Sequence, residues 1–274
     1  MGNKILILGK GFIGDRLAKE LPCDVSTKRI NSFKDADQII EEFRPKIIIN
    51  CIGHTGLNNV DGCERDIDKT LQANTFVPII LAETALRRNV KLAHISSGCV
   101  YHFDYSKDKP IGETREPDFY DLFYSRSKIY SEGILGQLAK RYNMLIARIR
   151  VPIDSIPHPK NTLTKLIAYR KIIDIPNSIT YIPDFMNALK HLLKIDARGI
   201  YNIVTKGALR YPDLLDAYKK YVPGFTYETI DLTKLKLVRT NLILSAQKLQ
   251  KSGFNVRPTK EILEECVKNY IKYS

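Results

Sequence analysis

With 274 residues and 44% hydrophobic content, the chain is long enough for one large domain, or for one domain with a smaller lobe, around a substantial core. No run of about 18 apolar residues marks a membrane span, and the first residues lead into a strand-like pattern rather than a signal peptide, so we expect a soluble cytoplasmic protein. The formal net charge of +13 comes from dispersed Lys and Arg residues without a nucleic-acid motif, which indicates a solvated basic surface with some charge available for phosphorylated small molecules.

Short apolar strands alternate with helical stretches over the first half of the chain. We expect strands near 4–8, 23–27, 46–53, 91–98 and 144–153. We expect helices from the glycine-rich turn to about Leu21, over 32–43, over roughly 60–89, and from about Tyr124. This alternation is typical of a parallel sheet that is buried on both faces.

The regular alternation of strands and helices ends after Pro152, where "DSIPHPKN" predicts a proline-rich loop. A helix over 181–194, a strand over 199–204 and a closing helix over 261–273 follow. The simplest fold class is α/β, a Rossmann-like doubly wound parallel sheet with a smaller interleaved C-terminal substrate lobe. We expect the nucleotide-binding domain over 1–154, with part of 180–205, and a mainly substrate-binding lobe over 155–274.

The glycines of "GKGFIG" form a GxGxxG motif between a predicted strand and a predicted helix. Gly9 permits the tight turn, Gly11 lets a pyrophosphate approach the backbone, and Gly14 lets the helix pack on the strand. The N-terminus of the helix supplies amide donors to the phosphates. In this context the motif predicts a dinucleotide site.

The end of the second strand predicts which dinucleotide binds. An NAD site usually has an acidic residue about 20 residues after the motif, to accept hydrogen bonds from the ribose. Here the chain reads "STKRI" instead, with Lys28 and Arg29 placed where a 2′-phosphate would be bound. We therefore expect NADP(H), although one of the two basic side chains is equally compatible with simple solvation.

Tyr124 and Lys128 lie four residues apart in "YSRSK", so both point to one side of the predicted helix. A phenol with an ordinary pKa of about 10 exchanges protons poorly at neutral pH, and a nearby ammonium stabilises its phenolate form. A Tyr-x-x-x-Lys pair also arises by chance in ordinary helices. What favours chemistry is its order in the chain, after the glycine motif and the strand that ends in "SSGCVY".

In this order of motifs the sequence resembles the extended short-chain dehydrogenase/reductase family. Within that family it resembles the bifunctional UDP-4-keto-6-deoxyglucose 3,5-epimerase/4-reductases, the UDP-rhamnose synthases. The resemblance extends over nearly the whole chain, through "LGKGFIG", "GHTGLNNVDGCE", "SGCVY", "FYSRSK", "RIRVPI", "NTLTK" and "IPNSIT".

The resemblance implies roles in reduction. Tyr124 would protonate the substrate oxygen as hydride arrives, Lys128 would hold the nicotinamide ribose and tune Tyr124, and Ser97 would hydrogen-bond the same oxygen. Asn74 and Pro152 would border the cofactor. Further residues expected on the cofactor side lie in the glycine turn and after the third strand: Lys10, Phe12, Ile13, Cys51 and Gly53.

The resemblance also implies epimerisation, with Cys99 and Lys165 as the two acid/base groups. A ketone at sugar position 4 acidifies the protons at positions 3 and 5, and inversion needs one group to remove a proton and another to supply one to the opposite face. A thiol and a desolvated lysine are chemically suited to this. By residue type alone, Cys99 would be a buried inert thiol and Lys165 a surface lysine.

Substrate contacts are expected from two regions of the chain. The polar segment 53–59 predicts a loop beside the sugar, with His54, Thr55 and Asn59, although His54 is equally suited to a structural hydrogen bond. By resemblance, further contacts to the nucleotide diphosphate would come from Arg239, Asn241, Asn161 and Asn177.

The function implied is conversion of UDP-4-keto-6-deoxy-D-glucose to UDP-L-rhamnose by 3,5-epimerisation and NADPH-dependent reduction at position 4. The alternatives are a monofunctional reductase similar to dTDP-4-dehydrorhamnose reductase, and a non-catalytic NADP-binding regulatory subunit. An upstream 4,6-dehydratase would supply the substrate, and the family implies a homodimer. The five cysteines have no zinc-type spacing, so we expect no structural metal and no disulfide.

Overall fold

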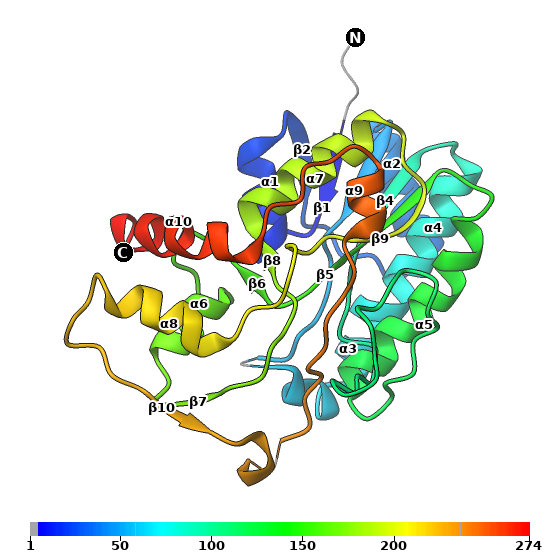
Figure 1. The fold of residues 1–274 in the computed structure, drawn as a ribbon. Coiled ribbons are helices and arrows are strands. Elements are labelled where there is room, and N and C mark those ends of the chain that lie inside the picture. The colour runs from blue at the N-terminus through cyan, green and yellow to red at the C-terminus, as the bar shows by residue number, and fades with distance from the viewer. Residues whose placement is uncertain (1–4, 58, 236) are drawn as a thin grey trace. The chain divides into compact units, whose positions relative to one another are not determined.

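The computed structural model describes residues 5–57, 59–235 and 237–274 (Figure 1). The chain divides into two compact units. Lys4, at the start of the first predicted strand, and Asn58, in the predicted 53–59 loop, lie outside the described residues. Unit 1 comprises the chain up to Val100, Pro117–Arg148 and Leu192–Tyr201, and unit 2 comprises Tyr101–Glu116, Ile149–His191 and Asn202–Ser274. Each unit is therefore assembled from separate stretches, and the domain boundary at residue 154 stays a prediction.

The larger sheet is parallel and six-stranded, in the order β2-β1-β3-β4-β5-β9. Its strands are β1 (Ile5–Leu8), β2 (Cys23–Ser26), β3 (Ile47–Asn50), β4 (Lys91–Ser97), β5 (Met144–Ile149) and β9 (Gly199–Asn202). Every residue of β3 and β4 is buried, as expected for strands covered on both faces. Because β2 and β3 lie on opposite sides of β1, the winding reverses at β1, and ligands of such sheets bind at the carboxyl ends of the strands there.

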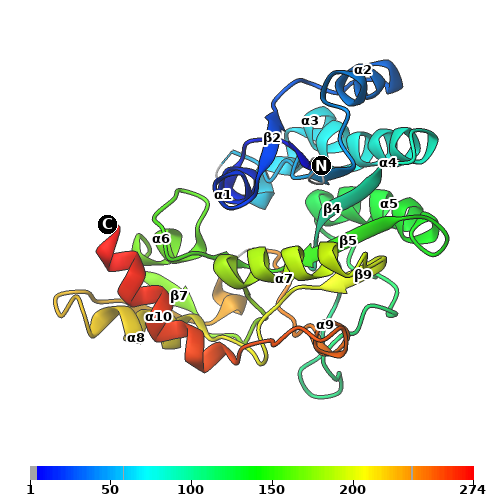
Figure 2. The same ribbon diagram turned by 90° about the horizontal axis from the view of Figure 1, so that it is seen from above.

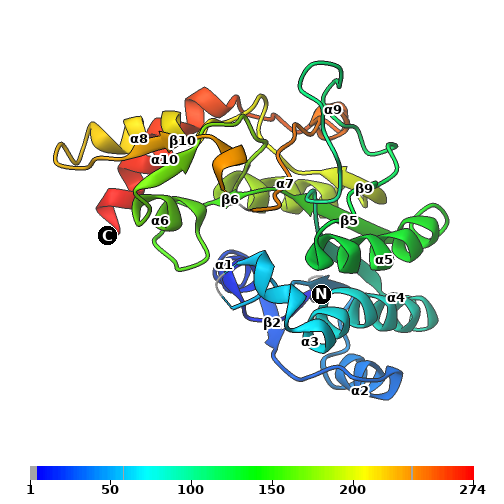
Figure 3. The ribbon, with the colours of Figure 1, turned by 90° about the horizontal axis from the view of Figure 1, so that it is seen from below.

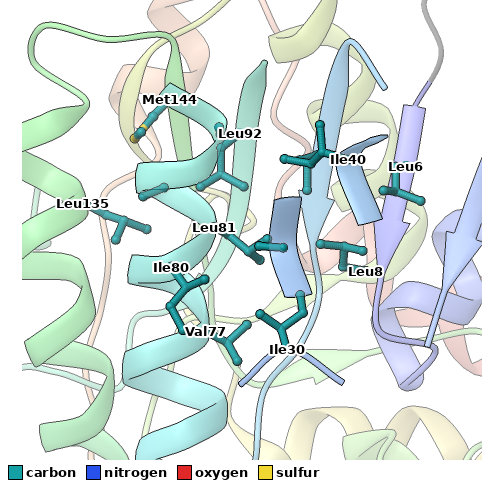
Figure 4. Close-up of a cluster of buried hydrophobic side chains, with 14 of the residues drawn as sticks. Leu6, Leu8, Ile30, Ile40, Val77, Ile80, Leu81, Leu92, Leu135 and Met144 are labelled. Atoms are coloured by element: carbon teal, nitrogen blue, oxygen red, sulfur yellow. The ribbon is translucent and has the colours of Figure 1, made fainter. Parts of the chain in front are cut away.

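Helices of unit 1 cover this sheet. They include α1 (Phe12–Glu20), α2 (Phe33–Phe43), α4 (Val77–Arg87) and α5 (Phe123–Leu138). Figure 2 shows α2, α4 and α5 in a row, and their apolar faces form one core with the strands. Figure 4 shows part of this core, in which Leu81 of α4 and Leu135 of α5 lie near Leu92 of β4. A capping box between Ser32 and Asp35 begins α2 by satisfying its first amides.

The helical region predicted over roughly 60–89 is confirmed, but the structure divides it into four helical elements instead of one continuous helix. They are η1 (Val60–Glu64, a 3-10 helix), α3 (Ile67–Leu71), η2 (Gln72–Phe76, a π-helical turn) and α4. Pro78 has no amide hydrogen and its ring would clash with the carbonyl of Asn74 in a regular helix. The wider turn, closed by Val77 N donating to Gln72 O, accommodates the proline.

The strand predicted over 144–153 also ends early. It stops as β5 at Ile149, and a separate strand β6 (Pro152–Ile153) pairs instead with β8 (Thr180–Tyr181) in unit 2. Val151, between the two strands, has a φ of +38°, a conformation that is rare and strained for a β-branched residue. The turn at Val151 therefore takes Pro152 out of the larger sheet.

Unit 2 contains two small parallel sheets and its own core. Its second sheet pairs β7 (Lys171–Ile173) with β10 (Glu228–Ile230). The helical elements are α6 (Thr162–Ile167), α8 (Tyr211–Lys219), η3 (Leu232–Lys234), α9 (Gln247–Lys251), α10 (Thr259–Lys272) and most of α7 (Ile182–Lys194). Figure 3 shows α8 and α10 side by side, and they bury Leu214, Ile262 and Val267. In the part of the chain that the structure describes, no helix is long and apolar enough to cross a membrane.

Candidate active site

The glycine turn after β1 has the geometry of a dinucleotide-binding loop. Gly9 has a φ of +90°, and a Cβ on Gly14 would lie 1.9 Å from the carbonyl oxygen of Gly9, so no larger residue fits at either position. A Cβ on Gly11, by contrast, would meet nothing within 4 Å. The backbone is therefore closely packed around Gly9 and Gly14. At Gly11, by the N-terminus of α1, there is open space where a pyrophosphate would approach.

Two basic side chains follow β2 at the predicted ribose position. Lys28 and Arg29 are both exposed. The Lys28 ammonium lies 2.5 Å from a carboxylate oxygen of Glu42 on α2, and its amide donates to Ser26 Oγ. The same loop is held from the other side by Gln72, whose Nε2 donates to the carbonyl of Ile30 over 2.8 Å. The loop is thus anchored to α2 and to η2, with positive charge at its surface.

The segment after β3 lies against the glycine turn. Cys51 donates its amide to the carbonyl of Leu8, and burial raises the pKa of the Cys51 thiol to about 12. The Cys51 thiol is therefore uncharged at neutral pH, so it lines the turn and is not a reactive group. Gly53 is exposed, and a Cβ there would lie 3.5 Å from Lys128 Nζ, so this glycine leaves space beside the Lys128 ammonium.

Asn74 of η2 joins the segment after β3 to α5. Its Oδ1 accepts from His54 N over 2.8 Å, and its Nδ2 donates to the carbonyl of His54 and to Ser127 Oγ. The adjacent Thr75 Oγ1 donates to the carbonyl of Ser127. Asn74 is completely buried. The π-helical turn thus places the side-chain amide of Asn74 between the segment after β3 and α5.

The predicted substrate loop has its own internal contacts. The His54 ring lies 3.3 Å from a carboxylate oxygen of Asp66, and Asn59 caps η1 by accepting a hydrogen bond from Asp61 N. Thr55 is half-buried and Asn59 is exposed. The sugar contacts expected from His54, Thr55 and Asn59 stay predictions.

Tyr124 and Lys128 lie one turn apart on α5, and their residues are only 8% and 5% exposed. Burial lowers the pKa of Lys128 to about 8, while Glu132 and Cys63 oppose this shift. An ammonium with such a pKa is largely charged at neutral pH and can still exchange its proton. The structure therefore places the phenol and the amine as the spacing predicts, on the buried side of α5.

Ser97 and Cys99 lie at the carboxyl end of β4. Ser97 Oγ accepts from Cys99 N over 3.1 Å, and Ser125 Oγ of α5 donates to the carbonyl of Cys99 over 2.6 Å. Cys99 is half-buried. The backbone that bears this thiol is thus attached directly to the helix that bears Tyr124 and Lys128.

Sequence reasoning missed a buried ion pair in the same unit. Glu132 of α5 accepts hydrogen bonds from Arg148 of β5 and from Ser96 of β4. The signal that could have found Glu132 is its spacing, because it lies four residues after Lys128 just as Lys128 lies four after Tyr124.

In unit 2, Lys165 lies on α6, which Asn161 caps through Leu163 N. Burial lowers the pKa of Lys165, and the positive charge of Lys160 adds to this effect. The amide of Asn161 is completely buried, accepts from Asp154 N and donates to the carbonyls of Asp154 and Ile156. These contacts build the loop before α6, and the nucleotide contact expected from Asn161 stays a prediction.

A second missed residue, Arg150, organises the other predicted nucleotide-binding segment. Arg150 is buried and donates to Asn177 Oδ1, to Thr240 Oγ1 and to the carbonyl of Thr240. Asn177 Nδ2 in turn donates to Asn241 Oδ1 over 2.8 Å. Arg239 is half-buried in the same segment. The structure thus groups Asn177 with Asn241, and their nucleotide contacts stay predictions.

No group of three or more His, Cys, Asp or Glu side chains that could hold a metal ion occurs within residues 5–57, 59–235 and 237–274.

The fold and these residues define an extended short-chain dehydrogenase/reductase. Residues 3–171 match the family described as RmlD substrate binding domain, and the chain belongs to this family. It is 32% identical to the bifunctional dTDP-4-dehydrorhamnose 3,5-epimerase/dTDP-4-dehydrorhamnose reductase of Arabidopsis thaliana, over 96% of this chain and 91% of that protein. It is 28% identical to a trifunctional UDP-glucose 4,6-dehydratase/UDP-4-keto-6-deoxy-D-glucose 3,5-epimerase/UDP-4-keto-L-rhamnose-reductase of the same plant, but spans only 42% of its length.

Solved structures share the fold over essentially the whole chain. The L780 UDP-rhamnose synthase of Acanthamoeba polyphaga mimivirus is similar with a TM-score of 0.90, at 24% identity, over 97% of this chain and 99% of that one. The dTDP-4-dehydrorhamnose reductase of Bacillus anthracis, solved in complex with NADP, is similar with a TM-score of 0.85, at 19% identity, over the full length of both chains. At these identities the likeness establishes the fold.

Proposed function

We propose that this protein converts UDP-4-keto-6-deoxy-D-glucose to UDP-L-rhamnose, by epimerisation at positions 3 and 5 and NADPH-dependent reduction at position 4. The observation that carries the proposal is the hydrogen bond from Ser125 to the carbonyl of Cys99. It attaches the backbone that bears the Cys99 thiol to the helix of the proposed reductase pair Tyr124 and Lys128. Reduction alone has no use for that thiol, whereas the plant relative is named for both activities.

The cofactor is NADP(H). The open face of Gly11 fits a pyrophosphate, and Lys28 and Arg29, which follow β2, fit a 2′-phosphate, where an NAD site would have an acidic residue. Gly9, Gly14, Lys10, Phe12 and Ile13 would form the turn around the phosphates. Cys51, Gly53, Asn74 and Pro152 would lie on the nicotinamide side.

Reduction uses the residues of α5 and β4. When bound, NADPH supplies the hydride to C4 of the sugar. Tyr124 donates its phenolic proton to the C4 oxygen, which becomes the new hydroxyl, and Ser97 donates a hydrogen bond to the same oxygen. Lys128 stays charged and stabilises the resulting phenolate until Tyr124 takes a proton from solvent.

Epimerisation precedes reduction, because only the 4-keto sugar has acidic protons at positions 3 and 5. A basic group removes one of these protons, the electron pair moves into an enolate at C4, and an acid returns a proton to the opposite face. Cys99 and Lys165 act as this acid/base couple, and the lowered pKa of Lys165 suits proton exchange. Ser97 and Tyr124 stabilise the enolate oxygen as they stabilise the alkoxide in reduction.

The substrate is a nucleotide diphosphate sugar. His54, Thr55 and Asn59 are proposed to contact the sugar, and Asn161, Asn177, Arg239 and Asn241 the nucleotide. We prefer UDP because the trifunctional relatives are named for UDP-sugars, although the bifunctional relative is named for the dTDP-sugar. Direct competition between the two nucleotides would measure this preference.

The protein is proposed to act in the cytoplasm as a homodimer, downstream of a 4,6-dehydratase. The trifunctional plant relatives carry a 4,6-dehydratase activity in their names, which supports such a partner here. Tyr130 and Ile134 are exposed one turn apart on α5, and such an apolar surface supports self-association.

The test is NMR of the purified protein with UDP-4-keto-6-deoxyglucose in deuterated water, with and without NADPH. We expect deuterium at positions 3 and 5 in both cases, and UDP-rhamnose only with NADPH. Oxidation of NADPH without deuterium entry would instead establish a monofunctional reductase, similar to dTDP-4-dehydrorhamnose reductase. Absence of both signals would favour a regulatory NADP-binding subunit.

A further inference from the structure

A buried ion pair lies next to Lys128 and has no part in the proton transfers described above. Glu132 Oε1 accepts from Arg148 Nε over 2.8 Å and from Arg148 Nη2, and Glu132 Oε2 accepts from Ser96 Oγ over 2.7 Å. The side chains of Arg148 and Glu132 are only 1% and 4% exposed. Two of these three donors belong to the positively charged Arg148 guanidinium, which is the natural partner of a carboxylate.

Glu132 is the anion among the described groups that face Lys128. Glu132 of α5, Cys63 of η1 and His94 of β4 interact electrostatically with Lys128. Tyr124 lies one turn away on α5, and Asn74 Oδ1 and Lys128 Nζ both lie beside Gly53. Burial holds the pKa of His94 well below its usual range and raises the pKa of the Cys63 thiol, so both are neutral at pH 7. The negative charge that opposes desolvation of Lys128 at this pH therefore comes from Glu132.

The His94 tautomer is consistent with this charge balance. Asn50 Oδ1 accepts from Ile52 N, so Asn50 Nδ2 is the donor to His94 Nδ1, 3.1 Å away. The proton of the neutral ring is then on Nε2. The neutral His94 ring consequently places neither a negative nor a positive charge beside Lys128.

Stability alone gives little reason for the ion pair, because buried ion pairs are often replaced by apolar residues without loss. The placement of the ion pair gives a functional reason. Side chains of β4 and β5 hold the Glu132 carboxylate of α5 one helical turn from Lys128. We propose that Glu132 is a positioning residue for reduction, whose carboxylate, clamped by Arg148 and Ser96, keeps the buried Lys128 ammonium charged and in place for Tyr124. The inference rests on the proposed reductase activity.

Glu132→Gln tests the charge while preserving size and a hydrogen-bonding oxygen. Without the carboxylate, the pKa of Lys128 falls further and the ammonium is lost at lower pH. The alkaline limb of kcat/KM for NADPH-dependent reduction should move down by about one pH unit. The loss of kcat/KM relative to wild type should then be about sixfold greater at pH 8.5 than at pH 6.5. Glu64→Gln is the matched control, because Glu64 contacts the start of the same helix through Phe123 N and should leave the limb in place.

A second variant separates charge from packing. Glu132→Gln removes the anion that pairs with the buried Arg148 guanidinium, so Glu132→Gln/Arg148→Met removes both charges and should restore folding. We expect its alkaline limb between those of the single variant and the wild type. A limb at the wild-type position in the double variant, or in Glu132→Gln itself, would show that Glu132 is only structural and overturn the proposal.

Unfolding of the cofactor-free protein gives a readout that needs no turnover. A buried lysine with a lowered pKa binds fewer protons in the folded protein than in the unfolded chain. The free energy of unfolding therefore rises with pH between the folded and unfolded pKa values of that lysine. Comparison with Lys128→Met isolates this rise, which should begin at lower pH in Glu132→Gln than in the wild type. An unchanged onset would refute the role of Glu132. If the wild type oxidises no NADPH, the proposed function fails, and the unfolding data still decide the Glu132–Lys128 coupling.

Discussion

Asn74 donates a hydrogen bond from Nδ2 to Ser127 Oγ, 3.1 Å away, and through it the π-helical turn η2 contacts the helix that bears Tyr124 and Lys128. The same amide fixes the backbone of His54 on its other side. One completely buried side chain thus links the loop after β3 to α5.

Asn74→Ala should therefore affect both activity and stability. We expect kcat/KM for reduction to fall about 100-fold, because small displacements of catalytic groups are costly, and the free energy of unfolding to fall by about 1–3 kcal/mol as buried backbone groups lose their partner. Ser127→Ala keeps the bonds to His54 and should cost less than about tenfold in kcat/KM. Equal losses in the two variants, measured by steady-state kinetics and urea unfolding, would refute this role of Asn74.

The pKa of Lys128 predicts how reduction depends on pH. Lys128 must be protonated to stabilise the Tyr124 phenolate, and burial lowers its pKa to about 8. In the wild type, kcat/KM should be highest below this value and decline above it, because kcat/KM reports the ionisations of the free enzyme. A profile that stays level up to pH 10 would contradict the assignment.

Cys99→Ala should separate the two activities. We expect deuterium entry at sugar positions 3 and 5 to fall at least about 100-fold, the usual scale for loss of an acid/base group, while the Kd for NADPH stays within about threefold, a change of less than 1 kcal/mol. Cys23→Ala is the control, because Cys23 is also half-buried but lies at the start of β2, outside the proposed site. Exchange at the wild-type rate in Cys99→Ala would exclude the thiol as an acid/base group.

The ion pair between Lys28 and Glu42 predicts an adjustable cofactor preference. Arg29→Ala and Lys28→Ala should each weaken discrimination of NADPH from NADH, by about tenfold for loss of one charge-assisted contact. Glu42→Gln releases the Lys28 ammonium from its partner and should shift preference in the opposite direction. The ratio of kcat/KM values for the two cofactors is the measurement, and a ratio unchanged in all three variants would place the 2′-phosphate elsewhere.

Lys91 and Asp196 predict a small acid sensitivity of unit 1. The Lys91 ammonium is buried and donates to Asp196, Asn143 and the carbonyl of Ala197, and the bond from Lys91 lowers the pKa of Asp196 to about 2. A carboxyl with a lowered pKa stabilises the fold above its unfolded pKa, and this contribution is lost as pH falls from about 4 to about 2. Because the Asp196 side chain is 54% exposed, we expect less than about 1 kcal/mol.

Urea unfolding of Asp196→Asn and wild type between pH 2 and pH 6 measures this contribution. The difference in the free energy of unfolding should be constant above about pH 4 and shrink below it. A difference that does not change with pH would show that Asp196 acts through packing alone.

Local patterns in the sequence were sufficient for the nucleotide-binding half of the fold. The alternation of apolar strands and helices predicts the parallel sheet, and the three glycines predict the turn, because each depends on residues adjacent in the chain. The Tyr124–Lys128 pair was predictable for the same reason, since a helix alone places residues four apart on one side.

Other features depend on residues far apart in the chain. The sequence alone contains Pro78, but it did not indicate that the preceding turn would widen and place Asn74 between His54 and Ser127. Asn161 and Asn177, expected at the nucleotide, make internal hydrogen bonds that depend on the loops around them.

The sequence by itself therefore determined the class of fold, the glycine turn after β1 and the placement of Tyr124 and Lys128 on one side of α5. Only the tertiary structure decided which polar groups pair with one another, as Glu132 does with Arg148 and Asn177 with Arg150. The physical reason is that local periodicity reports which side of an element is buried. The partner of a buried charge or amide is instead chosen by the packing of strands and helices that lie far apart in sequence.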